Sequence, residues 1–217
     1  RVLRYDGNNI CFNLIEHLDK LEDLYLAGED IRNIPDAYFD FVKSRQKIRW
    51  WKKYGILPVY AAAKIRDKGF EFIPEHLSIK SRCGPALPCV LKIDEDLLQM
   101  FGLWLAEGCY DKNSVIIANE DEECRDVIVR VGEKLNINAK NHSDGVSLML
   151  NSKALRFIME RVLGFSGDSF TKRFPAWVFD LPAERISDIL RGYFSGDGHV
   201  SKFEIQARSS SLQLLKD

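Results

Sequence analysis

Two acidic residues, Glu107 and Asp197, stand at matched places in two similar segments of the chain. The first segment reads Phe-Gly-Leu-Trp-Leu-Ala-Glu-Gly and the second reads Arg-Gly-Tyr-Phe-Ser-Gly-Asp-Gly. They align without a gap, and their acids are 90 positions apart (197 minus 107). Two carboxylates brought side by side would hold a divalent cation, which is the equipment for hydrolysing a phosphodiester.

Each acid is expected at the end of an apolar helix that carries a stripe of small residues. Gly102 and Ala106 lie four positions apart in the first segment, and Gly192 and Gly196 do so in the second. Residues four apart share one helix face, so the two stripes would let the helices pack nearly backbone to backbone. Glycine inside a helix costs about 0.5 to 1 kcal/mol relative to alanine, so its repeated use favours this packing.

Such packing would place both carboxylates at the same end of the helix pair. A carboxylate in the last turn faces the negative end of the helix dipole, and a second carboxylate beside it adds like-charge repulsion. A divalent cation would relieve both. Two carboxylates, with room left for water and phosphate oxygens, suit Mg²⁺ (or Mn²⁺). The glycine after each acid is expected to cap its helix in a left-handed conformation.

Residues 1–90 are predicted to form a mainly helical accessory region that ends in a boundary loop, Ser81–Pro88, rich in glycine and proline. Within it, residues 43–53 carry a basic run around two tryptophans. Two interpretations stay open for this run. One is a helix-turn-helix-like module that contacts DNA phosphates, and the other is a helix with a solvated basic face and a tryptophan in the core.

The remainder predicts an α+β fold built from a unit that is used twice. Residues 91–182 give a helix, a strand, a helix, a hairpin and a further helix, with a tight two-residue turn at Asp144-Gly145. Residues 183–217 start the series again, with a helix that ends at Asp197 and a strand at 203–208. The second unit is therefore incomplete.

Composition limits the classes of function. The net charge of −1 over 217 residues excludes a surface that is cationic everywhere, so a nucleic-acid surface must be local. No apolar run is long enough for a membrane span, no signal pattern is present, and five scattered cysteines predict reduced thiols in a cytoplasm. Both ends of the sequence look cut, as in a piece of a longer protein.

The two motif segments resemble the paired dodecapeptide motifs of the LAGLIDADG homing endonucleases, of the DOD type found in archaeal inteins. The resemblance covers residues 95–217. It implies an αββαββα half whose saddle-shaped sheet lies in the DNA major groove, then the start of a pseudo-symmetric second half, with the motif helices between them. Glu107 and Asp197 fall at the metal-ligand positions, although aspartate is commoner at the first.

The resemblance also implies a lysine near the scissile phosphate, in a Lys-x-x-Pro stretch ahead of the second motif. Here that stretch gives Lys172 as the candidate and Arg173 as the second choice. Both could equally be solvated loop cations.

DNA-reading side chains are expected to alternate outward along the strands. In the first half the candidates are Asn119, Lys140, His142, Ser147 and Asn151. In the second half they are Lys202, Glu204, Gln206 and Arg208, while Phe203, Ile205 and Ala207 would face the core. An ordinary half-buried sheet gives the same alternation.

The sequence thus predicts a Mg²⁺-dependent endonuclease that cuts double-stranded DNA at a long target site. It would be a cytoplasmic enzyme acting on nucleoid DNA, a monomer when full length, with no membrane association. The alternatives are a degenerate relative that binds DNA or RNA without cutting, such as a maturase, and a transcription regulator. The intact acids at both motif ends count against them.

Overall fold

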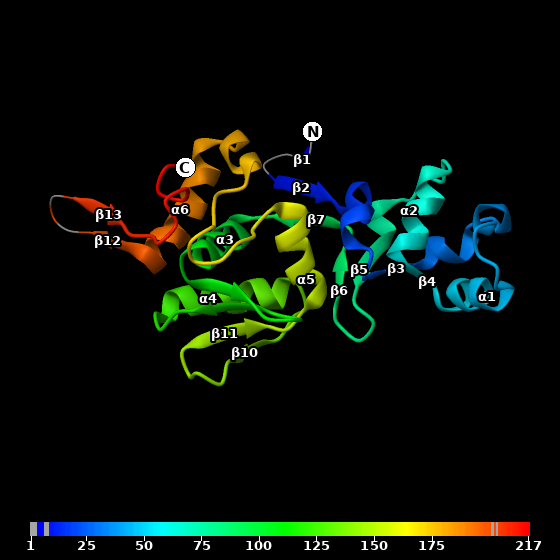
Figure 1. Ribbon diagram of the computed structural model, residues 1–217, viewed down its shortest axis with the longest axis horizontal. Coiled ribbons are helices and arrows are strands. Elements are labelled where there is room, and N and C mark those ends of the chain that lie inside the picture. The colour runs from blue at the N-terminus through cyan, green and yellow to red at the C-terminus, as the bar shows by residue number, and fades with distance from the viewer. Residues whose placement is uncertain (1–3, 7–8, 201, 203) are drawn as a thin grey trace.

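The computed structural model describes residues 4–6, 9–200, 202 and 204–217, which form an α+β fold of antiparallel sheets and packed helices (Figure 1). Up to residue 93 the elements are β1 (Arg4–Asp6), β2 (Asn9–Asn13), η1 (Leu14–Leu21), β3 (Tyr25–Gly28), η2 (Glu29–Asn33), η3 (Asp36–Phe39), α1 (Arg45–Tyr54), β4 (Ile56–Pro58), α2 (Val59–Asp67), η4 (Pro74–His76), β5 (Leu77–Lys80), β6 (Ala86–Pro88) and β7 (Val90–Ile93). They are followed by α3 (Glu95–Glu107), β8 (Gly108–Tyr110), β9 (Val115–Ala118), α4 (Glu122–Lys134), β10 (Ala139–Asn141), β11 (Ser147–Leu150), α5 (Lys153–Phe157), η5 (Ile158–Leu163), η6 (Ala176–Asp180), α6 (Ala183–Asp197), β12 (Gly198–Val200) and β13 (Ile205–Ala207).

The region before residue 90 contains the helices that the sequence predicts and, in addition, two antiparallel sheets that it did not predict. One sheet has the strand order β4-β3-β5-β6, and the other has the order β1-β2-β7. Helices α1 and α2 are present and are joined by residues 55–58, of which β4 pairs with β3. These strands are three to five residues long, and apolar runs that short do not distinguish a strand from a helical turn.

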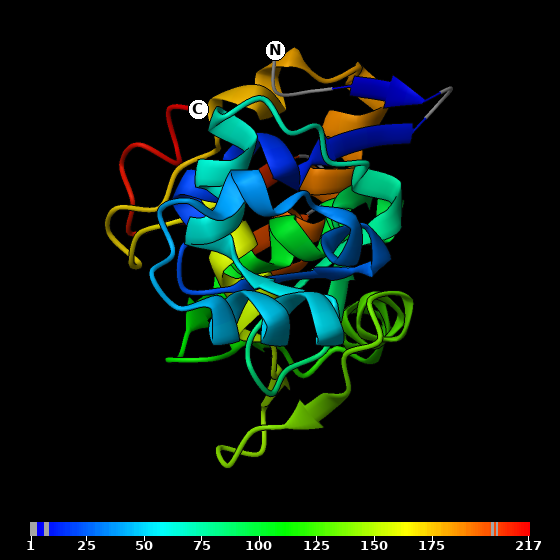
Figure 2. The ribbon, with the colours of Figure 1, turned by 90° about the vertical axis from the view of Figure 1, so that its right-hand side faces the viewer.

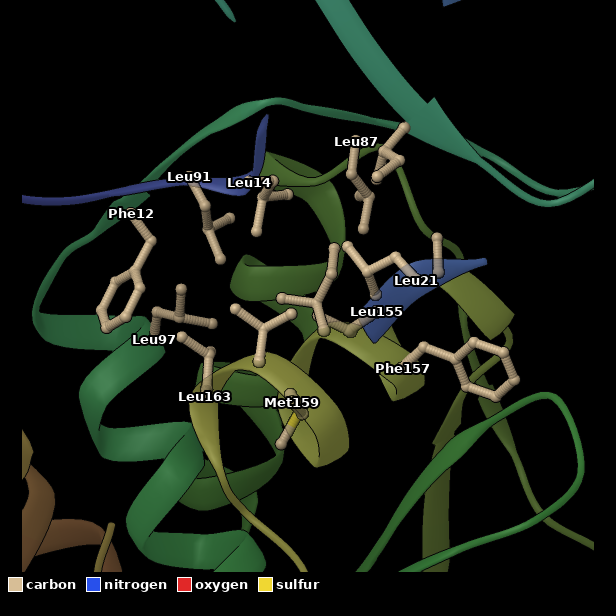
Figure 3. Packing of buried hydrophobic residues seen from close by; sticks show 14 of the residues in the cluster. Phe12, Leu14, Leu21, Leu87, Leu91, Leu97, Leu155, Phe157, Met159 and Leu163 are labelled. Carbon is tan, nitrogen blue, oxygen red and sulfur yellow. The ribbon is translucent and has the colours of Figure 1, made fainter. Parts of the chain in front are cut away.

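The loop expected as a domain boundary is the turn of the β5–β6 hairpin, in which Ser78 pairs with Pro88. Strand β7 then pairs with β2, so the chain returns to the first residues of the protein before α3 begins. Figure 3 shows Phe12 and Leu14 packed in one cluster with Leu155. The hydrophobic core therefore runs continuously across residue 90.

From α3 to α5 the elements follow the order αββαββα, and the four strands form one antiparallel sheet, β10-β11-β9-β8. Helix α4 packs against one face of this sheet, since a Cβ atom on Gly132 would lie 3.1 Å from Cδ2 of Leu150. Leu150 pairs with Val115, and both are buried. The opposite face carries the side chains that alternate with them, among them Met149 and Ile116.

The β10–β11 connection is longer than the two-residue turn expected at Asp144-Gly145. Strand β10 ends at Asn141 and β11 begins at Ser147. Gly145 has a positive φ of 79°, and the carboxylate of Asp144 accepts the backbone N–H groups of Val146 (3.0 Å) and Ser147 (2.8 Å). These side-chain hydrogen bonds stabilise a wider turn than the Asp-Gly pair alone predicts.

The second unit consists of α6 followed by the hairpin β12–β13, in which His199 pairs with Gln206. The strand expected at 203–208 is β13, and the backbone N–H of Arg208 donates to the carbonyl of Asp197 at 3.1 Å. The expected inward side chains of Phe203 and Ile205 lie outside what the structure describes. No helix in the described part of the chain is long and apolar enough to cross a membrane.

Candidate metal centre

Helix α3 is buried on nearly all sides and begins at a well-formed cap. The side chain of Asp94 accepts the backbone N–H of Leu97 at 3.0 Å, and Glu95 and Asp96 add negative charge to the first turn, where the helix dipole favours it. The helix ends at Glu107 because the chain passes directly into β8 at Gly108. Glu107 is thereby fixed at a helix end beside a strand.

The glycines that follow the two acids are not left-handed, so that expectation is wrong. Gly108 has φ −90° and ψ 155°, and Gly198 has φ −92° and ψ 154°, both in the extended region. A Cβ atom on Gly108 would collide with the Trp104 side chain, and one on Gly198 would lie 2.7 Å from Cα of Phe194. Glycine is needed here for space, because the chain leaves each helix sharply and enters a strand.

The two stripes of small residues face each other along α3 and α6. A Cβ atom on Gly102 would lie 2.6 Å from the backbone nitrogen of Tyr193, and one on Gly192 would overlap the carbonyl oxygen of Gln99. Nearer the acids, a Cβ atom on Gly196 would lie 2.5 Å from the Cβ of Ala106. Contacts advance in the same direction on both helices, so the helices are parallel and their C-terminal ends meet.

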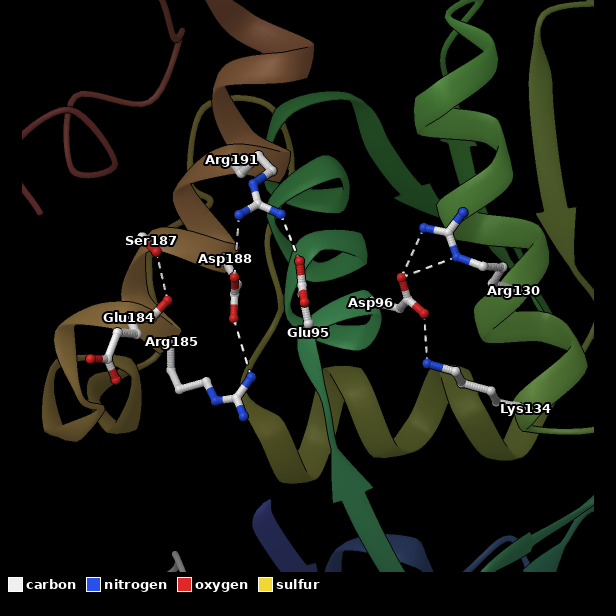
Figure 4. A network of polar contacts seen from close by, with 9 residues as sticks. All are labelled: Glu95, Asp96, Arg130, Lys134, Glu184, Arg185, Ser187, Asp188 and Arg191. Atoms are coloured by element: carbon white, nitrogen blue, oxygen red, sulfur yellow. Dashed lines mark hydrogen bonds and ion pairs between the residues drawn. The ribbon is translucent and has the colours of Figure 1, made fainter. Parts of the chain in front are cut away.

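Ion pairs hold the opposite end of this helix pair (Figure 4). Arg191 of α6 lies 2.7 Å from Oε1 of Glu95 on α3. Arg130 and Lys134 of α4 both bind the Asp96 carboxylate, at 2.9 and 2.6 Å. Exposed pairs of this kind contribute roughly 0 to 1 kcal/mol each, so close backbone packing, rather than charge, fixes the separation of the helices.

Glu107 and Asp197 come together at the shared end. Glu107 is exposed and Asp197 is half-buried, and a Cβ atom on the intervening Gly196 would lie 3.3 Å from Cγ of Glu107. Burial, and then the negative charge of Glu107, raise the pKa of Asp197, and the cation of Lys172 opposes them. The carboxylates therefore repel each other, and a cation between them would remove that cost.

The residues present fit a hard divalent cation with an open coordination shell. No group of three or more His, Cys, Asp or Glu that could hold a metal occurs within the described ranges. Glu107 and Asp197 would thus supply two carboxylate groups, and water and substrate would complete the shell. Mg²⁺ is usually bound in this way, whereas Zn²⁺ in structural sites prefers four His or Cys ligands.

Lys172 lies beneath this end of the helix pair. Its side chain is buried, with a residue exposure of only 5%, and Nζ donates to the carbonyl oxygens of Trp104 (2.8 Å) and Gly108 (2.6 Å). Nζ also lies 4.7 Å from the centre of the Trp104 ring. Burial lowers the pKa of Lys172 to about 8, against the opposing charges of Asp197 and then of Cys109 and Glu107.

Two residues that support Lys172 were not among the sequence candidates. The Ser211 hydroxyl donates to the backbone carbonyl of Lys172 at 2.6 Å, which ties the C-terminal segment to the lysine. Trp104 supplies the ring under Nζ and is itself stacked on Tyr110, with ring centres 4.7 Å apart. Trp104 belongs to the first motif, and its position there could have marked it as a candidate site residue. No local sequence pattern marks Ser211.

Several of the residues expected to contact DNA are exposed. Lys140 of β10 is exposed and pairs with Met149, which pairs with Ile116, which pairs in turn with Cys109. This row crosses the sheet on the face opposite Leu150 and ends two residues after Glu107. Asn151 and Arg173 are also exposed, and so are Lys202, Glu204 and Arg208 of the second unit, whereas Gln206 is half-buried.

Three other candidates are engaged within the fold. Ser147 is buried and its hydroxyl donates to the Asp144 carboxylate at 2.6 Å, which corrects the expectation that it faces solvent. Half-buried His142 places Nδ1 3.1 Å from the same carboxylate. Oδ1 of Asn119 accepts the backbone N–H of Asp121 at 2.8 Å, just before α4. These side chains stabilise the loops at the edge of the sheet.

The second unit is similar to a known protein family. Residues 184–217 match a family model described as a LAGLIDADG-like domain. The matched segment includes α6 with its glycine stripe, Asp197 and the β12–β13 hairpin.

Longer similarities join the chain to larger proteins. It is 31% identical over 61% of its length to the DNA-directed RNA polymerase subunit Rpo1C of Methanocaldococcus jannaschii, where the match covers 16% of that protein. It is 31% identical over 70% of its length to an iron-sulfur cluster assembly SufBD family protein of Mycobacterium leprae, covering 18%. It is 30% identical over 56% of its length to the DNA polymerase II large subunit of Thermococcus kodakarensis, covering 7%. The chain spans less than a fifth of each of these relatives.

Proposed function

We propose that this chain carries the catalytic centre of a homing endonuclease, a site-specific enzyme that hydrolyses phosphodiesters in double-stranded DNA. The observation that carries the proposal is the meeting of Glu107 and Asp197 at the ends of two helices that touch through glycine and alanine. The family match adds weight because it covers α6 and the second acid.

The identities of the relatives support an enzyme of the intein type. These relatives are an RNA polymerase subunit, an iron-sulfur cluster assembly protein and a DNA polymerase subunit, which perform unlike tasks. The similarity to this chain is nevertheless confined to a minor part of each. A mobile segment inserted into unrelated hosts explains both facts, and a DNA-cutting enzyme is what such a segment needs in order to spread.

In the proposed mechanism Glu107 and Asp197 hold the cation, and Lys172 acts beside them. Bound Mg²⁺, or Mn²⁺, would neutralise charge on the phosphate and activate water. Because its pKa is about 8, Lys172 is mainly protonated at neutral pH, so Nζ can stabilise a charged oxygen, and it gives up its proton more readily than a solvated lysine does. The Trp104 and Gly108 carbonyls take two of its hydrogen bonds and so orient it.

The outward face of the β10-β11-β9-β8 sheet is the proposed DNA surface. Lys140 begins a row of side chains that leads to Cys109 beside the acids, so DNA lying along the sheet would reach them. Asn151 and Arg173 are exposed and able to contact base edges or phosphates. Lys202 and Arg208 would extend the contact across the second unit, giving a long duplex target.

The test is cleavage of plasmids that carry candidate insertion sites, in Mg²⁺ and in EDTA. We expect wild type to linearise one plasmid class only with metal. Glu107→Gln and Asp197→Asn should each lower the rate at least about 1,000-fold, because each removes several kcal/mol of charge stabilisation. Glu184→Gln, at the far end of α6, is the matched control and should cut normally.

Cleavage that persisted in either acid variant would refute the two-acid mechanism. Tight binding of the plasmid by wild type without cleavage would instead support the degenerate DNA-binding protein.

A further inference from the structure

Three exposed aromatic side chains gather in the N-terminal region, at the end of the molecule away from α6 (Figure 1). Trp50 and Tyr54 of α1 are 49% and 50% exposed, and Tyr60 at the start of α2 is 45% exposed. The rings of Trp50 and Tyr54 are 4.9 Å apart. Large exposed aromatics that cluster in this way mark binding surfaces.

Trp50 and Tyr60 line a surface hollow of about 600 Å³, which we call the aromatic hollow. Its volume lies in the range of small-ligand sites, roughly 300 to 1,000 Å³. Figure 2 shows α1 crossing the end of the molecule that faces the viewer, in front of the sheet that contains β3 and β5. Beside the two rings, the charged residues that line the hollow are Glu22, Asp23, Lys47, Lys80 and Arg82.

Cations surround the aromatic rings. Lys47, Lys80 and Arg82 line the hollow, and none of them forms an ion pair with an acid in the described part of the chain. Of the two acids that also line it, Asp23 pairs with Arg161 at 3.4 Å. The positive charge around the rings is therefore available to an anionic ligand.

The core does not account for the exposed tryptophan. Trp51 is buried and packs against Phe39 with ring centres 6.3 Å apart, so α1 already makes its core contact through that residue. A helix that needed only a solvated basic face would have no use for Trp50 and Tyr54 at its surface. Aromatic rings interleaved with lysine and arginine are instead the chemistry that binds unpaired nucleic-acid strands.

We propose that the aromatic hollow binds an unpaired nucleic-acid strand, with bases stacked on Trp50 and Tyr60 and phosphates beside Lys47, Lys80 and Arg82. A duplex keeps the faces of its bases stacked inside the helix, so it would satisfy the cations but leave the rings uncovered. The site is separate from Glu107 and Asp197, and its occupation requires neither a metal nor cleavage.

The experiment measures fluorescence anisotropy of a labelled oligothymidylate, an oligouridylate and a duplex of equal length, with EDTA present and the whole chain used throughout. We expect one or both single strands to bind more tightly than the duplex. Trp50→Ala should weaken that binding about 5- to 150-fold, the range for losing one stacked base. Lys47→Ala should lower the salt slope of log K by about 0.7.

Trp50→Phe keeps an aromatic face and should retain most of the affinity, while losing the quenching of tryptophan fluorescence that stacking causes. Phe179→Ala, an exposed aromatic outside the hollow, and Lys64→Ala, an exposed lysine of α2, are the matched controls and should bind as wild type does. The better of the two single strands tells whether the ligand is DNA or RNA.

Two results would overturn the proposal. One is a duplex that binds as well as the single strands, and the other is single-strand binding that Trp50→Ala leaves unchanged. Neither result bears on Glu107 and Asp197, which are tested by cleavage.

Discussion

The contact between Gly196 and Ala106 allows a swap experiment on the packing that brings the acids together. In the structure a Cβ atom on Gly196 would lie 2.5 Å from the Cβ of Ala106, whereas ordinary contacts begin at 3.4 Å. The shortfall is 0.9 Å (3.4 minus 2.5), and it falls on a rigid methyl group. Gly196→Ala should therefore push the helix ends apart, although alanine is the better helix former.

Overpacking of this kind costs about 1 to 3 kcal/mol, against a gain of up to about 1 kcal/mol from helix propensity, so we expect net destabilisation of about 1 to 2 kcal/mol. Ala106→Gly removes the opposing methyl group, and the next atom from the new Cβ would be Cγ of Glu107 at 3.3 Å. The double variant should therefore recover at least half of the loss suffered by Gly196→Ala.

The assay is urea unfolding of wild type, the two single variants and the double variant, combined as a double-mutant cycle. We expect a favourable coupling of about 1 kcal/mol or more between the two substitutions, since residues in contact are not additive. The rate of DNA cleavage should change with stability: it should fall in Gly196→Ala and recover in the double variant. A Gly196→Ala protein more stable than wild type would refute the close packing of α3 and α6.

Three further predictions concern the residues around Lys172 and the ion pairs. Burial depresses the folded-state pKa of Lys172 from 10.5 to about 8, so the unfolded chain binds more protons between those values and stability should rise with pH across that window. Relative to Lys172→Met, wild type should gain roughly 3 kcal/mol from pH 8 to pH 10.5 in chemical unfolding, and parallel curves would contradict the burial. Ser211→Ala removes the hydrogen bond to the lysine backbone and should cost about 1 to 3 kcal/mol in the same assay while slowing cleavage. Arg191→Gln breaks the exposed pair with Glu95 and leaves the buried Asp188 paired with Arg185, so it should cost about 1 kcal/mol with cleavage unchanged, and a large loss of activity would show that charge holds the helices.

The sequence carries much of the geometry near the acids, because both motif helices are long and periodic. The four-residue spacing of small residues predicts that the two motif helices pack closely. The acids at the ends of the two helices then lie at the same end of the helix pair. The same segments predicted a helix, a strand, a helix, a hairpin and a helix, whereas strand β8 was implied only by the family resemblance. A pair of acids whose position depends on spacing within each helix can therefore be predicted from the sequence.

Other features depend on contacts between distant residues and are not visible in the sequence. Whether Lys172 is solvated or buried was undecided from the sequence, since its partners are carbonyls 64 and 68 positions away. Strands β3 to β6 are too short for their period to show, so the N-terminal sheets were missed. Gly108 looked like a left-handed cap because sequence does not reveal that the Trp104 side chain fills the space a Cβ would need.

The central claim is that Glu107 and Asp197 share one divalent cation, and Mn²⁺ binding followed by electron paramagnetic resonance tests it most directly. Wild type and Glu184→Gln should each bind Mn²⁺ at one site, competed by Mg²⁺. Glu107→Gln and Asp197→Asn should each lose that site, because neither carboxylate alone holds the ion. Wild-type affinity for Mn²⁺ in either acid variant would contradict a shared cation at the meeting of α3 and α6.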